Sequence, residues 1–180
     1  MESRFGPALW QQFAASLDML EDTIAACPDD LWTARIWPET PPEWFPECFA
    51  EFWYVAYHTL VWLDLYLRGV PEEEFAPPPP FIAGEVDSPA TTPDQPWSRE
   101  QLTEYLHSLR EECRGRLLEL TEQEAGRHVE YGWSEGQPVT YAELLLYNLR
   151  HLAGHGAQLS LFLGQHGVPG DKLDWVTRAR

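Results

Sequence analysis

The chain of 180 residues is poor in cysteine and in basic side chains, and each shortage argues against a class of protein. Its three cysteines are scattered and form no CxxC pair, so they do not make a disulfide framework. Only 12 Lys and Arg accompany 29 Asp and Glu, which gives a formal charge of −17. Because a surface this acidic repels phosphate groups, we expect no nucleic-acid partner and no binding to an anionic membrane.

Long apolar runs are also missing from the sequence. No stretch approaches the ~18 apolar residues that a membrane-spanning helix needs. The opening residues MESRFGPALWQQ lack the basic region followed by an apolar region that marks a signal peptide. We therefore expect a cytoplasmic protein without a membrane partner. Aromatic residues, by contrast, are plentiful, with nine Trp, eight Phe and seven Tyr, and they argue for one globular domain over residues 1–180.

Four segments repeat apolar residues every three or four positions, which predicts four amphipathic helices. The predicted helices cover residues 9–27, 49–67, 99–120 and 141–163. Pro28 and Gly69 supply stop signals for the first two helices. Capping-box patterns begin at Ser98 and Thr140, immediately before the last two helices. No segment alternates as a strand does, although residues 128–133 leave room for a brief extended piece.

The second and third predicted helices are separated by a long, proline-rich connection, residues 70–97. Its prolines prevent a regular helix, and a connection of this length is unusual inside a compact domain. It is either a solvated linker or a crossover that runs back along the helices or covers one end. Four residues give a crossover something to bury, namely Phe75, Phe81, Ile82 and Trp97. The fold class that we predict is all-α, a four-helix bundle with this long crossover between helices two and three.

Two histidines stand four positions apart in the last predicted helix, within the stretch HLAGH. His151 and His155 share the apolar face of that helix, because its opposite face carries Glu143, Arg150 and Gln158. Buried imidazoles need partners, and two imidazoles at this spacing can bind one divalent cation. His58, in the apolar run FWYVAYHTLVW of the second helix, is the candidate third ligand. The alternative is that each of the three is a core histidine with a hydrogen-bond partner.

The remaining histidines and the polar neighbours of the three-histidine group have plainer interpretations. His107, His128 and His166 fall off the apolar faces, and we expect them to be solvated. Helical spacing places Tyr54, Tyr57 and Asn148 near the group, either as substrate contacts or as core residues with a satisfied polar tip. No side chain in the sequence can be identified as a general base, so the catalytic residues stay open.

The predicted arrangement resembles the DinB-like (YfiT-like) family of metal-binding four-helix bundles. The resemblance is carried by VAYHTLVWLDLYL, by TYAELLLYNLRHLAGHGAQLSLFLGQHG and by AACPDDLW at the end of the first helix. It implies a divalent ion held by His58, His151 and His155, with water completing the shell. It also implies a homodimer. The fold is similar to that of bacterial thiol-dependent transferases and of some metal-dependent isomerases and hydrolases.

Two functions from different classes follow. The first is a metal-dependent enzyme that acts on a small molecule, possibly a thiol, as an S-transferase or a hydrolase. Three neutral imidazoles would leave a zinc ion its full charge and an open position for water or for a substrate thiol. Zinc and nickel both suit imidazole, so the sequence does not choose between them. The second is a non-catalytic helical module for dimerisation or protein interaction, with a structural metal or none.

Overall fold

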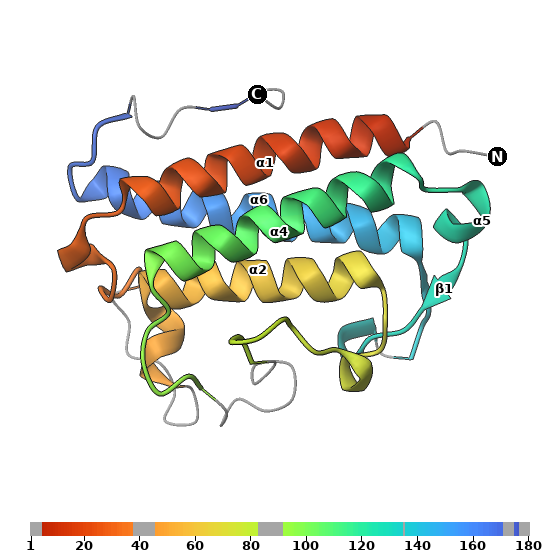
Figure 1. The fold of residues 1–180 in the computed structure, drawn as a ribbon, viewed down its shortest axis with the longest axis horizontal. Helices are drawn as coiled ribbons and strands as arrows, with labels where there is room; N and C mark the ends of the chain where they lie inside the picture. The colour runs from red at the N-terminus through yellow and green to blue at the C-terminus, as the bar shows by residue number, and fades with distance from the viewer. Residues whose placement is uncertain (1–4, 38–45, 83–91, 135, 171–174, 177–180) are drawn as a thin grey trace.

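The computed structural model describes residues 5–37, 46–82, 92–134, 136–170 and 175–176, and it is predominantly helical (Figure 1). The four long helices are α1 (Gly6–Ala26), α2 (Phe52–Arg68), α4 (Arg99–Leu118) and α6 (Tyr141–Gln165). The short elements are helix α5 (Glu122–Ala125), strands β1 (His128–Val129) and β2 (Val139–Thr140), and 3₁₀ turns at Asp29–Leu31, Glu47–Ala50, Glu72–Glu74 and Gly132–Ser134. The all-α fold class predicted from the sequence is therefore confirmed. The two strands pair antiparallel. β1 lies within residues 128–133, where the sequence left room for a brief extended piece.

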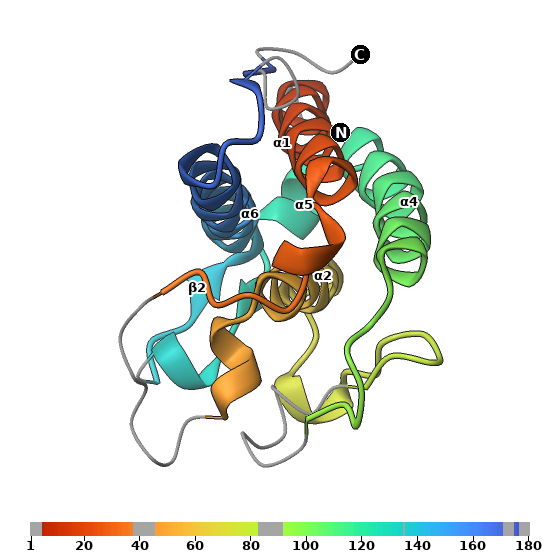
Figure 2. The same cartoon turned by 90° about the vertical axis from the view of Figure 1, so that its left-hand side faces the viewer.

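The four long helices form a bundle in which each packs against two others. Helix α1 packs against α4 and α6, and α2 packs against the same two helices (Figure 2). Helices α2 and α4 run in the same direction along the bundle (Figure 1). Because two parallel neighbours cannot be joined by a short turn, the connection must carry the chain back along the bundle. None of the helices in the described part of the chain is long and apolar enough to cross a membrane.

The proline-rich connection is a crossover and not a solvated linker, because its described ends pack on the bundle. Phe75 is 6% exposed, and the ring of Phe81 stacks on Tyr105 of α4 at 4.5 Å between centroids. Trp97 meets Phe81 edge-on at 5.0 Å, and Trp32 donates its indole N–H to the Trp97 carbonyl at 2.9 Å. The central residues of the connection, 83–91, lie outside the described part of the chain.

Helix α2 is buried on almost every side. Every residue from Phe52 to Arg68 is buried except His58, Trp62 and Arg68. A helix that is apolar all round belongs in the core, so any polar side chain on α2 needs a partner within the protein. Two of them find one locally: Thr59 donates to the Val55 carbonyl at 2.6 Å, and Arg68 donates to Asp64 at 2.6 and 3.1 Å. His58 and Trp62 stand one turn apart and mark the side on which α2 leaves the core.

The start of the second helix differs from the sequence prediction, which placed Phe49 inside it. Phe49 lies in the 3₁₀ turn Glu47–Ala50, and α2 begins at Phe52. The reason is a contact with a distant part of the chain. Glu51 is extended and forms a bridge with Arg35, and the backbone N–H of Phe52 donates to the Ala34 carbonyl at 3.0 Å. Without these contacts, the same backbone groups could form the hydrogen bonds of an additional helical turn before Phe52.

The predicted helix signals are present at the other ends. Ser98 and Gln101 form a complete capping box, in which each side chain bonds the other's backbone N–H. The Thr140 hydroxyl accepts from the backbone N–H of Glu143 at 3.2 Å and starts α6. Gly69 ends α2 with φ +58°, a left-handed conformation that favours glycine. These local signals fix where the helices begin and end, and thereby the relative height of residues on α2 and α6.

Candidate metal centre

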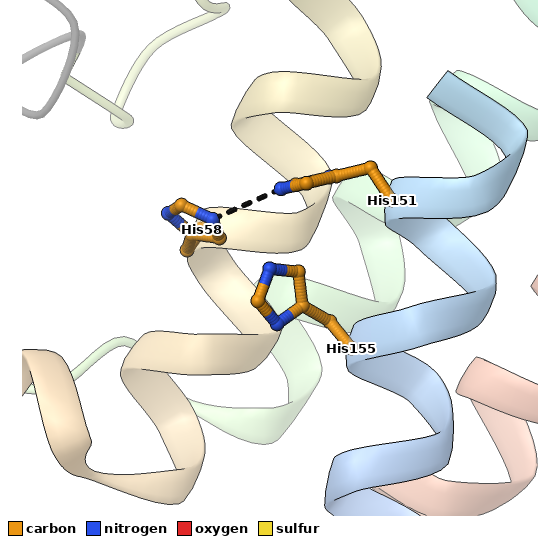
Figure 3. Close-up of side chains that lie close together, drawn as sticks. All are labelled: His58, His151 and His155. Atoms are coloured by element: carbon orange, nitrogen blue, oxygen red, sulfur yellow. Dashed lines mark hydrogen bonds between the residues drawn. The ribbon is translucent and has the colours of Figure 1, made fainter. Parts of the chain in front are cut away.

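Three imidazoles from two neighbouring helices converge at the side of the bundle. His58 extends from α2, and His151 and His155 extend from adjacent turns of α6 (Figure 3). Their ring centroids are 5.0 Å apart for His58 and His151, 4.8 Å for His58 and His155, and 4.5 Å for His151 and His155. One nitrogen from each ring can be chosen so that all three lie within 4.8 Å of one another. The structure therefore brings together the three histidines that the sequence predicted as one group.

The distances within this histidine group suit a shared ion. The Nε2 atoms of His58 and His151 are 3.1 Å apart. Two imidazoles on a tetrahedral zinc ion, each with a Zn–N distance of about 2.0–2.1 Å, have nitrogens roughly 3.3 Å apart. Among the described residues the group contains only histidine and no carboxylate or thiol. A neutral three-nitrogen donor set of this kind fits zinc, nickel or copper better than magnesium or calcium, which prefer oxygen.

Burial keeps His151 in the form that binds a metal. Burial, together with the neighbouring imidazoles of His58 and His155, lowers its pKa from 6.5 to about 2. At neutral pH the ring is therefore uncharged. Its Nδ1 atom is buried and has no hydrogen-bond partner among the described residues. The nitrogen that approaches His58 is the other one, Nε2, so Nε2 is the atom of His151 that could bind a shared ion.

A hydrogen bond orients the ring of His155. Its Nδ1 lies 2.8 Å from the side-chain oxygen of Gln158, three residues along α6. Since that oxygen can only accept, Nδ1 carries the proton and the Nε2 lone pair is the ligand atom. The sequence placed Gln158 on the polar face opposite the histidines. Its side chain is exposed but reaches His155, because residues three apart on a helix are neighbours.

The three histidines are partly buried, whereas the sequence predicted a fully buried face of α6. The leucines and Asn148 of that face are buried as expected. His151 and His155 lie at its edge, where α6 meets the exposed side of α2. This position makes the histidine group accessible from outside the bundle, as a substrate site requires.

An apolar pocket of about 280 Å³ opens beside the histidine group. Besides His58 and His155, it is lined by Trp37, Phe49, Tyr54, Val55 and Trp62. A hollow of about 390 Å³ between α1 and α6 is lined by none of the three histidines. The smaller pocket is the one that can bring a ligand to them. On the far side of the group, the rings of Tyr66 and Tyr147 lie 6.3 and 6.4 Å from His151.

The other residues singled out in the sequence lie in ordinary surroundings. Tyr57 donates to the Ile82 carbonyl and packs against Phe81 and Trp97. Asn148 is fully buried and donates to the Leu63 carbonyl at 3.1 Å. Both are core residues, whereas Tyr54 lines the pocket. His128 and His166 are exposed, as predicted.

His107 is also half-exposed, but it pairs with Glu21 at 2.7 Å. Apart from Tyr54, sequence reasoning missed the aromatic walls of the pocket. Trp62 could have been found, because it stands four residues after His58 on α2. Trp37 and Phe49 carry no such signal, since they come from the segment before α2.

Comparison with known families agrees with the geometry. A family model of the DinB superfamily matches residues 12–159, from the first turns of α1 to beyond His155. A comparison with curated proteins finds no match. The matched region contains α2 and α4, most of α1 and α6, and the whole histidine group. This chain therefore belongs to the DinB superfamily.

Proposed function

We propose that this chain is a metal-dependent enzyme that acts on a small molecule, and that His58, His151 and His155 hold its zinc or nickel ion. The observation that carries the proposal is the convergence of three imidazoles, with one nitrogen of each within 4.8 Å of the others, beside an apolar pocket. Structural zinc sites are usually closed by four protein ligands, whereas catalytic sites have three and one open position. The described part of the chain supplies three, and family membership supports a metal at this place.

Within this class, transfer onto a thiol fits the site best. A bound divalent ion would supply a positive charge that lowers the pKa of a thiol or water placed next to it. The thiol proton then passes to solvent, sulfur bonds to an electrophilic carbon, and the leaving group departs with its bonding electron pair. The apolar walls favour the thiol over water as the nucleophile, because they bury few groups that could hold water in place.

The chain's own residues have separate tasks in this reaction. The neutral imidazoles of the histidine group hold the ion without reducing its charge. Gln158 fixes the orientation of His155 through the 2.8 Å hydrogen bond. The apolar pocket walls would offer few hydrogen-bond partners to water on the side where His58 and His155 meet the ligand. No step requires a general base beside the histidines, since solvent can take the thiol proton.

Elemental analysis of untagged protein tests the metal site. We expect about one zinc or nickel ion per chain, lost when any of His58, His151 or His155 is replaced by Ala. The matched control is His107→Ala, since His107 is half-exposed and pairs with Glu21 outside the group. Circular dichroism would show that the variants remain folded. Full metal occupancy in His155→Ala would refute the assignment.

Activity assays on the metal-loaded protein then decide the reaction class. We expect consumption of thiols in the presence of a chromogenic aryl halide, and little hydrolysis of aryl esters. Hydrolysis without thiol consumption would make the protein a hydrolase instead. A folded protein that binds no metal and associates with increasing concentration would support the non-catalytic interaction module. The homodimer stays a prediction, which light scattering on the purified chain tests.

A further inference from the structure

We propose that the pocket beside the histidine group binds a single uncharged aromatic ring, so that the substrate is a small neutral aromatic compound. The inference deepens the proposed function and rests on it in one respect, namely that the reactive group of this compound meets the ion. The pocket contains His58 and His155 among its lining residues. A ligand that fills it therefore touches two of the three proposed metal ligands.

The walls of the pocket are aromatic and firmly held. Phe49 and Tyr54 stack with centroids 4.3 Å apart and an interplanar angle of 22°, and both are buried. Trp62 packs between His58 at 6.1 Å and Tyr66 at 5.2 Å. Rings fixed in this way offer faces and edges that an aromatic ligand matches better than a flexible aliphatic one does. Because the rings are already packed against the core, binding would order few side chains.

The pocket walls disfavour a substrate whose main part, apart from the reactive group, carries a charge. None of the described residues that line the pocket is Asp, Glu, Lys or Arg. Moving a charged group into such surroundings costs free energy that nothing on these walls repays. The chain's formal charge of −17 further disfavours anionic compounds at a distance. The polar part of the ligand is thus confined to the end of the pocket that His58 and His155 form.

The size of the pocket suits one ring that carries a substituent. The pocket has a volume of about 280 Å³. An apolar cavity of roughly 150 Å³ is enough to bind benzene. The pocket therefore has room for one ring with a short substituent, such as a methanethiol group. The ring would pack against the aromatic walls, and the substituent would reach His58 and His155.

The first experiment tests the pocket without any metal. Saturation-transfer NMR on zinc-free protein uses benzyl alcohol, an uncharged ring without a thiol. The variant is Trp37→Ala, because Trp37 is 37% exposed at the rim and its loss spares the core. The matched control is Trp175→Ala, which changes an exposed tryptophan of the hollow between α1 and α6. We expect a clear signal in the native protein and the control, and a severalfold weaker signal in Trp37→Ala.

The second experiment compares two thiols on zinc-loaded protein by calorimetry. Phenylmethanethiol carries a neutral ring, and 2-mercaptoethanesulfonate carries a permanent negative charge. We expect the aromatic thiol to bind about tenfold more tightly, and Trp37→Ala to remove most of that difference. Equal or tighter binding of the sulfonate would overturn the inference while leaving the metal site intact. If the protein binds no zinc, the proposed function fails, and the benzyl alcohol signal alone decides whether the pocket takes an aromatic ring. Absence of that signal also overturns the inference.

Discussion

The carboxylate of Asp64 is fully buried near the C-terminal end of α2, and Arg68 supplies the positive charge that compensates it. Arg68 donates to both oxygens, at 2.6 and 3.1 Å, and Tyr105 of α4 adds a third hydrogen bond at 2.7 Å. Arg68→Met keeps the length of the side chain and removes the charge. The carboxylate is then left in the core with the Tyr105 hydroxyl as its remaining described partner. Removing one member of a buried ion pair typically costs 3–5 kcal/mol.

The structure allows that magnitude to be narrowed. Each hydrogen bond to a charged group contributes about 1.5–3 kcal/mol, and two are lost. The side chain of Arg68 is partly exposed, so in the variant water can replace part of its interaction with the Asp64 carboxylate. We therefore expect a loss of about 3 kcal/mol in the free energy of unfolding at neutral pH. That is a large share of the ~5–15 kcal/mol available to a domain.

The loss should shrink in acid, and the sign follows from the pKa of Asp64. Burial raises this pKa above the ordinary value of 3.8, against the opposing hydrogen bonds from Arg68 and Tyr105. Because the pKa of Asp64 is higher in the native state than in the unfolded state, binding of the proton stabilises the native state. This stabilisation is fully present below the unfolded-state pKa and is lost as the pH rises through the native-state pKa. Without Arg68 the native pKa rises further. The cost of Arg68→Met should thus decrease by up to about 1.4 kcal/mol per pH unit as Asp64 takes up its proton.

Urea unfolding of chelator-treated protein, followed by circular dichroism at pH 7.5 and 5.0, measures this effect. Arg116→Met is the control, because Arg116 also pairs with a carboxylate four residues away, the partly exposed Glu112, which lies 4.0 Å from Arg68 as well. It should cost less than about 0.5 kcal/mol. Adding Asp64→Asn to Arg68→Met should restore most of the loss. A cost below about 1 kcal/mol, or a cost that does not change with pH, would refute the reasoning.

Three further predictions address the metal, a turn and a helix cap. Zinc at one hundred times its dissociation constant should stabilise the native chain by about 2.7 kcal/mol and raise Tm, with chelator reversing the shift, and His151→Ala should abolish the effect. Gly69→Ala should lower the free energy of unfolding by more than 1 kcal/mol in urea, because Gly69 has φ +58° and an added Cβ would lie 2.8 Å from the Tyr141 ring. Ser98→Ala should cost about 1 kcal/mol in the same assay, since it removes the capping box of α4, whereas Ser98→Thr should cost little.

The helices could be predicted because their signals are local. Apolar periodicity located α1, α2, α4 and α6, and capping residues such as Ser98 and Thr140 fixed two starting points within a residue. The start of α2 could not be predicted in the same way. It depends on backbone contacts that Phe52 and Glu51 make with residues 34 and 35, and no sequence window contains both partners.

The histidine group could likewise be predicted from local signals, whereas the pocket beside it depends on tertiary contacts. His151 and His155 stand one turn apart on one helix, and His58 needed only the packing of α2 beside α6 to join them. The walls Trp37 and Phe49 come from the segment that precedes α2, whose path depends on tertiary contacts alone. An unusual abundance of tryptophan was visible in the sequence. That two of the nine, Trp37 and Trp62, line the pocket beside the histidines was not visible, because composition carries no information about position.

The polar residues of α2 offer an internal comparison that favours a ligand at His58. Thr59 satisfies its hydroxyl on its own helix, through the Val55 carbonyl. Asp64 is buried further along and is met by a matching cation and a hydroxyl. His58, in contrast, lies within hydrogen-bond distance of a second imidazole, at 3.1 Å from His151 Nε2, close to a third, and beside an open apolar pocket.

If His58 served only in packing, a side chain of complementary charge could bind it, as Arg68 binds Asp64. Three like groups that gather at an accessible edge are instead what a cation requires. The aromatic walls beside them leave room for the molecule on which that cation would act.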